Sequence, residues 1–206
     1  MIEASAVSRE LPAKPNDKTV LSHYSVTDSG YDEMYSAPGE LRPHWRHMAR
    51  FLEETGSEEL ARRQAEIQRL LQSDGVTYNT YDDPHESQRY WSLDPIPLLM
   101  TGEEWSTLAA GLEQRSRLLN ALLADLYGPR LTIRHGWLPP QLIHAHPGFL
   151  PPCHQSLPAG GRWLIFHGVD LARGPDGVFR VYGDRSQSPS GAGYTLENRI
   201  TLARAT

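Results

Sequence analysis

The feature that most constrains the fold is the segment 101–128, which reads TGEEWSTLAAGLEQRSRLLNALLADLYG. Thr101 and Glu104 stand three residues apart just before the apolar positions begin, which is the pattern of a capping box at a helix start. Apolar residues then recur at helical spacing, and Gly128 followed by proline ends the pattern. The sequence therefore predicts one long helix here, with Leu119 and Leu122 facing a core.

Shorter helices are predicted before this one. Segments 41–54 and 57–71 both show apolar residues at helical spacing, and Ser57 is a suitable N-cap for the second of them. The alternating residues at 76–80, which follow a glycine, predict a strand. Residues 1–30 are polar and aperiodic, so we expect a mobile N-terminal arm.

Strands gather late in the chain. A short helix that opens with proline is predicted at 139–146, and two strands are predicted at 162–173 and 178–185, joined by the turn GPDG. Because helices come first and strands last, the order predicts an α+β (mixed α/β) fold with N-terminal helices and a later antiparallel sheet.

Composition excludes several classes of protein. The 206 residues carry a net charge of −5, so no broad basic field is present to attract nucleic acid. Cys153 is the single cysteine, so no disulfide can form within the chain. No apolar run is long enough to cross a membrane, and the N-terminus lacks the apolar core of a signal peptide. We therefore expect a cytoplasmic protein that does not bind membranes.

Several pairs of residues could in principle carry chemistry. His44 with His47, and His144 with His146, have spacings that two metal ligands could use, but no third ligand is evident for either pair. Cys153 and His154 are adjacent, which is not how a nucleophile and its base usually meet. For all three pairs a structural role is the favoured interpretation.

The stretch DRSQSPSGAGYTLENR, residues 184–199, is different in kind. Asp170 and Asp184 close the two late strands, so a hairpin would bring both carboxylates near one of its ends. Carboxylates of this sort suit Mg²⁺, and the Ser- and Gly-rich residues that follow could form an anion-binding turn. Arg185 and Arg199 could contact a phosphate or a carboxylate. The alternative is an ordinary hairpin end with a solvated turn.

This stretch resembles the signature of the circularly permuted ATP-grasp proteins, in the branch with a DRTQAPSGAGYALENR-type motif. Further pieces match in order: YDEM with GELRPHW, DGVTYNTY, QRYWSLDPIPLLM, the long helix, GVDLAR and DGVFRV. In the long helix the resemblance rests on Gly111, Leu112, Gln114, Arg115, Asn120, Asp125 and Tyr127. The resemblance covers about residues 31–206, and each piece alone is less specific than their shared order.

The resemblance implies an ATP-grasp domain in permuted order, with ATP and Mg²⁺ as cofactors. It implies a ligase in which ATP phosphorylates a carboxylate and an amine attacks the acyl phosphate, mainly through positioning and charge neutralisation. It also assigns roles to residues of this chain. These are Arg199 and Arg185 as catalytic residues; Gln187, Ser190, Gly191, Glu197 and Asn198 as nucleotide contacts; and Asp170 and Asp184 as metal ligands.

Two departures from the family pattern affect these expectations. The better-known branch carries EDN where this chain has Gly183, Asp184 and Arg185, so only the aspartate of that metal motif is present. Family members also continue well past the ENR motif, so we expect residues 31–206 to be the N-terminal portion of a longer domain. The resemblance further suggests peptide-like substrates and an alpha-E or transglutaminase-like partner. A non-catalytic binding module is the alternative function.

Overall fold

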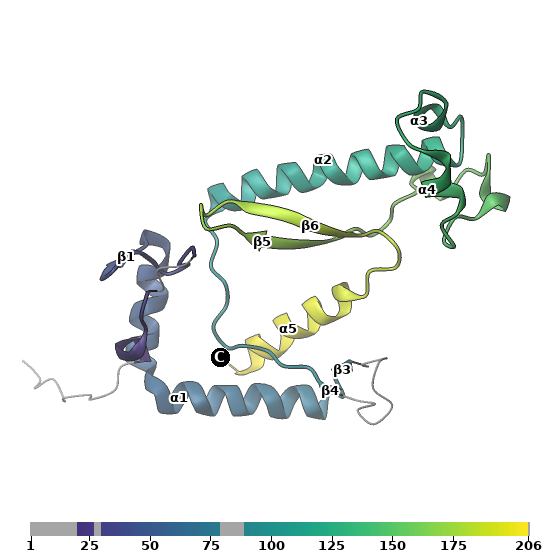
Figure 1. Ribbon diagram of the computed structural model, residues 1–206. Helices are drawn as coiled ribbons and strands as arrows, with labels where there is room; N and C mark the ends of the chain where they lie inside the picture. Colours follow the sequence, from purple (N-terminus) through teal and green to yellow (C-terminus); the bar gives the residue numbers. More distant parts are fainter. Residues whose placement is uncertain (1–19, 27–29, 79–88, 206) are drawn as a thin grey trace, which may run out of the picture. The chain divides into compact units, whose positions relative to one another are not determined.

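The computed structural model describes residues 20–26, 30–78 and 89–205. The chain divides into two compact units, which are described separately (Figure 1). Unit 1 consists of residues 1–26, 34–96 and 205–206, and unit 2 of residues 27–33 and 97–204. The described helices and short antiparallel sheets confirm the predicted α+β fold class.

Unit 1 is built around the helix α1. Its elements are η1 (Val20–His23), β1 (Tyr35–Ala37), β2 (Glu40–Leu41), η2 (Pro43–Trp45), α1 (Arg46–Ser73), β3 (Thr77–Tyr78) and β4 (Arg89–Tyr90). Within α1, Gly56 has φ 74° and ψ 167°, a left-handed conformation that side chains rarely adopt, and the helix bends there. The two helices predicted from sequence are therefore confirmed as the two halves of a kinked α1.

Unit 1 contains a hydrophobic core. On the first half of α1 and the turn before it, Trp45, Ala49 and Leu52 are buried at spacings of four and three residues. On the second half the same spacing recurs in a second buried group, which consists of Ile67, Leu70 and Leu71. Each group is a stripe along one helix face, as expected for an amphipathic helix packed against its own unit.

Part of the predicted mobile arm is folded. Residues Val20–His23 form a 3-10 helix that contacts α1, and the ring of Tyr24 stacks on that of Tyr35 at 5.5 Å between centroids. The expectation of an arm over 1–30 is therefore wrong from residue 20 to residue 26. Residues 1–19 lie outside the described part of the chain, where the arm stays a prediction.

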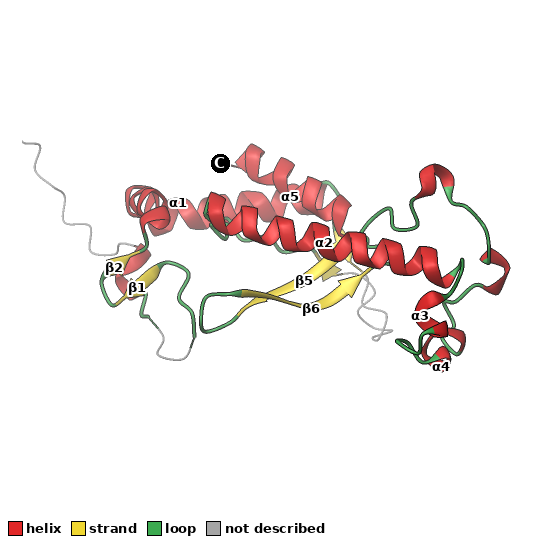
Figure 2. Cartoon of the chain, turned by 90° about the horizontal axis from the view of Figure 1, so that it is seen from above, coloured by secondary structure: helices red, strands yellow, loops and turns green. Residues whose placement is uncertain are grey.

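Unit 2 consists of the long helix, a hairpin and a final helix, with short helical turns between them (Figure 2). Its elements are α2 (Gly102–Leu126), α3 (Leu131–Arg134), α4 (Pro140–His144), η3 (Pro151–Cys153), η4 (Ala159–Gly161), β5 (Gly168–Arg173), β6 (Phe179–Arg185) and α5 (Gly191–Ala205). The predicted capping box of α2 is confirmed: the Glu104 amide donates to Thr101 Oγ1 at 3.1 Å, and the Thr101 amide donates to Glu104 Oε2 at 2.9 Å.

The core expected on α2 is only partly formed. Leu119 and Leu122 are half-buried, and Leu126 is the single hydrophobic residue of the described part of unit 2 that is buried. The last turns of α2 instead fix the following segment through polar contacts. Asp125 accepts hydrogen bonds from the amides of Leu131 and Thr132, at 2.7 and 2.9 Å.

Residues 128–167 are held against the end of α2 by two further side chains. The amide oxygen of Asn120 accepts from the backbone of Trp163 at 2.9 Å. The ring of Tyr127 lies between those of Phe149 and Trp163, with centroids 5.2 and 4.9 Å away. Asn120 and Tyr127 thus position a long excursion that contains little regular structure, and this explains why a specific residue type is needed at each position.

The hairpin β5–β6 is interrupted by a bulge. Asp170 pairs with Gly183 and Leu171 pairs with Val181, so Tyr182 is an extra residue in β6. Directly paired residues share a face, and neighbours along a strand alternate between faces. The bulge therefore shifts the alternation, and it places Asp184 on the same face as Val181 and Leu171.

Two sequence predictions for this region need correction. The strand predicted at 162–173 begins only at Gly168, because residues 162–167 have no strand partner among the described residues. The stretch 184–199 was predicted as one loop, but α5 begins at Gly191 and includes the ENR motif. Two glycines early in this stretch obscured a helical run that continues to Ala205.

Candidate functional site

The site is organised by the way α2 is fixed to β5 at two points. Ser116 Oγ lies 2.7 Å from Nδ1 of His167, just before β5, and Glu104 Oε1 accepts from Arg173 at 2.8 Å at the end of the strand. From Glu104 to Ser116 the helix advances about 18 Å, and from His167 to Arg173 the chain advances about 20 Å. The two spans match in length, so helix and strand lie antiparallel and are joined at both ends (Figure 1).

Arg173 is the more elaborate of the two joints. Its side chain is 6% exposed and donates to Glu33 at 2.7 Å and to Glu104 at 2.8 Å. Its guanidinium also lies 4.7 Å from the ring of Tyr31 and 4.0 Å from that of Phe179. Hydrogen bonds and aromatic faces together compensate the desolvation of this buried cation.

Glu104 takes part in both the helix cap and this joint. One carboxylate oxygen accepts from Thr101 and the other accepts from Arg173. The hydrogen bond from the Thr101 backbone, followed by that from Arg173, lowers the pKa of Glu104 to about 2. The start of α2 therefore depends on an ionised carboxylate.

Asp184 is the centre of the second joint. Arg115 of α2 donates from Nε to Asp184 Oδ1 at 2.7 Å and from Nη2 to Oδ2, a two-pronged arrangement. His167 lies 2.9 Å from Oδ1 through Nε2, and because a carboxylate only accepts, Nε2 is the donor. The hydrogen bond from Arg115 is the main cause that lowers the pKa of Asp184 to about 2.

Asp170 is paired differently. It accepts from Arg185 Nε at 3.0 Å, and both residues lie on the hairpin face opposite to that of Asp184. Gly183, which pairs with Asp170, leaves room for that carboxylate, since a Cβ there would lie 2.8 Å from Asp170 Oδ2. The hairpin thus brings the two acids to one end, as expected, but it does not bring them to one ion.

A magnesium site shared by Asp170 and Asp184 is therefore not formed by this geometry. The bulge sends the two carboxylates to opposite faces, and an arginine neutralises each of them. Among the residues that the structure describes, no three His, Cys, Asp or Glu side chains gather as a metal site. The residues present do not fit Mg²⁺ by themselves, although either aspartate as a single ligand stays a prediction.

The predicted nucleotide contacts lie beyond β6. Gln187 and Ser190 are exposed, Ser188 has φ 46° in the left-handed region, and Gly191 begins α5. The amide oxygen of Gln187 lies near Gly148. This short segment, residues 186–190, therefore presents polar groups to solvent next to a helix N-terminus.

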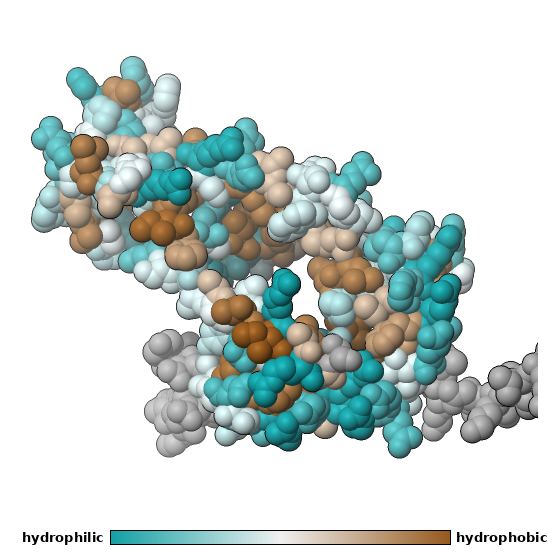
Figure 3. Space-filling view, turned by 180° about the vertical axis from the view of Figure 1, so that it is seen from behind, coloured by the Kyte–Doolittle hydropathy of each residue, from teal (hydrophilic) through white to brown (hydrophobic). Residues whose placement is uncertain are grey.

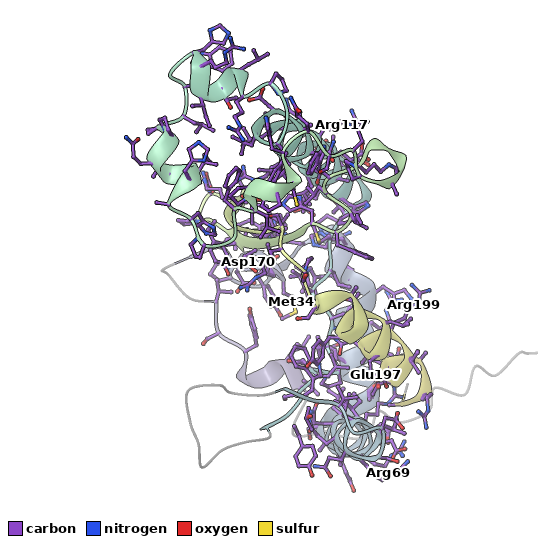
Figure 4. The ribbon with its side chains drawn as sticks, turned by 90° about the vertical axis from the view of Figure 1, so that its right-hand side faces the viewer. Met34, Arg69, Arg117, Asp170, Glu197 and Arg199 are labelled. Carbon is purple, nitrogen blue, oxygen red and sulfur yellow. The ribbon has the colours of Figure 1, made fainter. Side chains whose placement is uncertain are left out.

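The remaining predicted site residues belong to α5. Glu197 is half-buried and accepts from the Thr201 hydroxyl at 3.4 Å, and Asn198 is also half-buried. Arg199 is exposed and forms no ion pair with a described residue. Figure 4 shows Arg199 on α5 well apart from Asp170 on the hairpin. The structure brings Arg185 and Asp170 together, and it does not bring Arg199 to them.

Between α2 and β6 lies a groove of about 900 Å³, which we call the α2–β6 groove. Arg115 lies at one end and Glu103 and Glu104 at the other. Brown hydrophobic patches are visible in this part of the molecule in Figure 3. Its apolar lining comes from both elements: Leu108, Leu112, Leu118, Val178, Phe179 and Val181.

The other candidate pairs have structural surroundings. His146 Nδ1 accepts from the Gly148 amide at 3.0 Å, and His154 Nδ1 lies 3.0 Å from the carbonyl oxygen of Tyr127. His44 and His47 belong to no metal-ligand group among the described residues.

Sequence reasoning missed the partners that fix Asp184. Arg115 lies 69 residues before it, and His167 was counted only as part of a strand. Arg115 was one of the residues that carry the family resemblance, which is the signal that could have identified it. Arg173 and Glu33 gave no comparable signal, because a single arginine at a strand end is common.

No helix in the described part of the chain is both long and apolar enough to cross a membrane. Comparisons with known proteins identify relatives. An uncharacterized protein of Mycobacterium tuberculosis (strain H37Rv) is 40% identical over 185 residues, which are 86% of this chain and 21% of that protein. An uncharacterized protein of Synechocystis is 36% identical over 84% of this chain and 36% of its own length.

A Frankia alni protein named "Putative glutamate--cysteine ligase 2-3" is 33% identical over 83% of this chain and 20% of its own length. The chain thus spans about a fifth to a third of the length of these relatives. A sequence profile of the family "Circularly permuted ATP-grasp type 2" matches residues 97–206, which is more than half of the chain. This chain therefore belongs to the circularly permuted ATP-grasp type 2 family.

Proposed function

We propose that this chain is part of an ATP-dependent carboxylate–amine ligase. The observation that carries the proposal is the family match over residues 97–206, which include α2, the hairpin and the Asp184 site. Because the chain spans only a fraction of its relatives' length, the activity belongs to a polypeptide of the relatives' length that carries this chain.

The proposed reaction has two steps. A carboxylate oxygen of the acid attacks the γ-phosphorus of ATP, ADP leaves, and an acyl phosphate forms. The nitrogen of the amine then attacks the acyl carbon and loses a proton, and inorganic phosphate leaves. Bound Mg²⁺ would supply charge neutralisation at the phosphates.

Within this scheme, the chain's own residues bind and orient. The polar segment 186–190 and the first turn of α5 are suited to phosphate, because backbone N–H groups at a helix N-terminus favour anions. Gln187, Ser190 and Gly191 are the proposed contacts there, with Glu197 and Asn198 one to two turns further along α5. Arg185 and Arg199 are proposed as cationic groups for the reacting anions.

Asp184 takes a different proposed role from the one expected. Arg115 and His167 hold its carboxylate ionised at one end of the α2–β6 groove. We propose that it orients Arg115 and, with it, α2 relative to the hairpin, so that it acts as a positioning residue.

A non-catalytic ATP-grasp-like module is the second candidate. It is favoured by one observation: both aspartates of the hairpin are neutralised by arginines, and no cluster of three metal-ligand side chains exists among the described residues. A module of this kind would bind ATP without phosphorylating an acid.

A trapping experiment tests the ligase proposal. The long polypeptide is incubated with ATP, Mg²⁺, L-glutamate and hydroxylamine, with glutamate chosen because of the name of the Frankia relative. An acyl phosphate reacts with hydroxylamine to give a hydroxamate, so we expect a hydroxamate and ADP in equal amounts. ATP binding without hydroxamate from glutamate or from a panel of other amino acids would support the binding module instead.

Two matched variants test the role of Asp184. Asp184→Asn removes the charge that meets Arg115, and Asp176→Asn makes the same chemical change at the turn of the same hairpin. We expect at least a tenfold loss of hydroxamate formation for Asp184→Asn, with near-normal activity for Asp176→Asn. If Arg115→Lys restores part of the rate lost in Arg115→Ala, orientation by the ion pair is supported; equal loss in both variants contradicts it.

A further inference from the structure

The free edge of β6 is the surface with the most unexplained features. In the described part of the chain, β6 pairs only with β5. Its first residues, before the bulge, have no lysine or proline that would discourage pairing, and exposed regular edges of this kind recruit further strands. The α2–β6 groove lies along this edge.

The position of α2 explains why the groove is on the β6 side. The joints Ser116–His167 and Glu104–Arg173 fix α2 along β5, so the helix covers that strand. Both β5-side groups have side chains that are 6% exposed, which means that the β5 side is filled. On the β6 side, apolar residues of α2 face the groove and Leu118 is 66% exposed.

The depth and lining of the groove suit an extended segment of polypeptide. Phe179 and Val181 lie on the face of β6 that points toward α2, and Leu108 and Leu112 line the opposite wall. A strand added beside β6 would place every second side chain between these walls, and its backbone would pair with the free edge.

We infer that the α2–β6 groove is the docking site for a β-strand from the part of the polypeptide that the relatives have beyond the matched region. The relatives supply the argument for this occupant, since the matched residues make up only 20–36% of their lengths. The inference rests on family membership and not on the proposed ligase activity.

Hydrogen exchange tests the inference directly. The backbone amides of 179–182 are followed in the 206-residue chain and in a polypeptide of the relatives' length that carries it. Amides that point away from β5 should exchange at least tenfold more slowly in the longer protein. Equal exchange in both proteins, or new protection confined to β5, would overturn the inference.

A pair of substitutions supplies an independent readout. Val181→Glu puts a carboxylate into the groove, and Ala172→Glu puts one on the opposite face of the hairpin, where it faces Arg180. The difference between the two variants in melting temperature should be several degrees larger in the longer protein than in the 206-residue chain. An equal difference in both proteins would show that no strand covers Val181.

Sedimentation of the 206-residue chain tests the competing occupant. A monomer at all concentrations is expected, since the docking strand belongs to the same polypeptide. A dimer that forms with increasing concentration and is abolished by Val181→Glu would show that the edge pairs with a second copy, and the inference would fail. None of these measurements depends on ATP turnover, so they remain decisive if the ligase proposal is wrong.

Discussion

Unit 1 and unit 2 are stabilised in different ways. In unit 1, seven hydrophobic residues are buried, and Ile67 and Leu71 are fully inaccessible. In the described part of unit 2, Leu126 is the one buried hydrophobic residue, and the elements are joined by ionic and polar contacts around Arg173 and Asp184. The difference teaches that unit 1 has a hydrophobic core of its own, whereas unit 2 presents apolar surface that suits a further partner.

Removing a side chain from the core of unit 1 should have the largest effect on stability. Leu71 is 0% exposed, so Leu71→Ala leaves a cavity that should cost about 3 kcal/mol. The measurement is urea unfolding followed by amide exchange in α1, which reports on unit 1 alone. A cost below about 1 kcal/mol would mean that unit 1 is no better packed than unit 2.

Removing the central cation of unit 2 should have a somewhat smaller effect. Arg173→Ala deprives Glu33 and Glu104 of their shared partner and should cost about 2 kcal/mol, detected by faster exchange at the start of α2. Arg117→Ala is the matched control. Its pair with Glu113 is exposed, with 80% and 67% of the side chains accessible, so the change should stay within about 0.5 kcal/mol. Similar costs for both variants would contradict the special role of the buried joint.

The smallest expected effect is a dependence of unit 2 on pH. The pKa of Glu104 is lower in the folded chain, about 2, than its ordinary value of 4.5. Its contribution to stability is therefore complete above about pH 4.5 and is lost as the pH falls toward 2. Glu104→Gln should reduce this loss, measured by thermal unfolding between pH 5 and pH 2. Asp184 titrates in the same range, so the informative quantity is the difference between variant and wild type.

Local signals predicted much of the fold. The capping box of Thr101 and Glu104 located the start of α2, and Gly56 separated the two halves of α1. Both signals depend on residues that are close in sequence, and local hydrogen bonding is enough to specify them. The start of α5 was missed because Gly191 and Gly193 weaken the local helical pattern.

The candidate site was harder to predict, because its contacts are distant in sequence. Asp184 was identified as a site residue, but its partner Arg115 comes from a helix 69 residues away. The proposed pairing with Asp170 failed for a more specific reason. A bulge leaves no mark in a pattern of alternating residues, and counting from Val181 by twos assigns Asp184 to the wrong face.

The bulge at Tyr182 acts as a parity switch for the charge that α2 meets. With one extra residue in β6, a carboxylate faces the guanidinium of Arg115. If the same sequence paired without the bulge, Asp184 would turn away and Arg185 would take its place, so that two cations would oppose each other. An aligned aspartate in a related chain therefore has the same meaning only if the number of residues between it and the start of β6, and their pairing, are also the same.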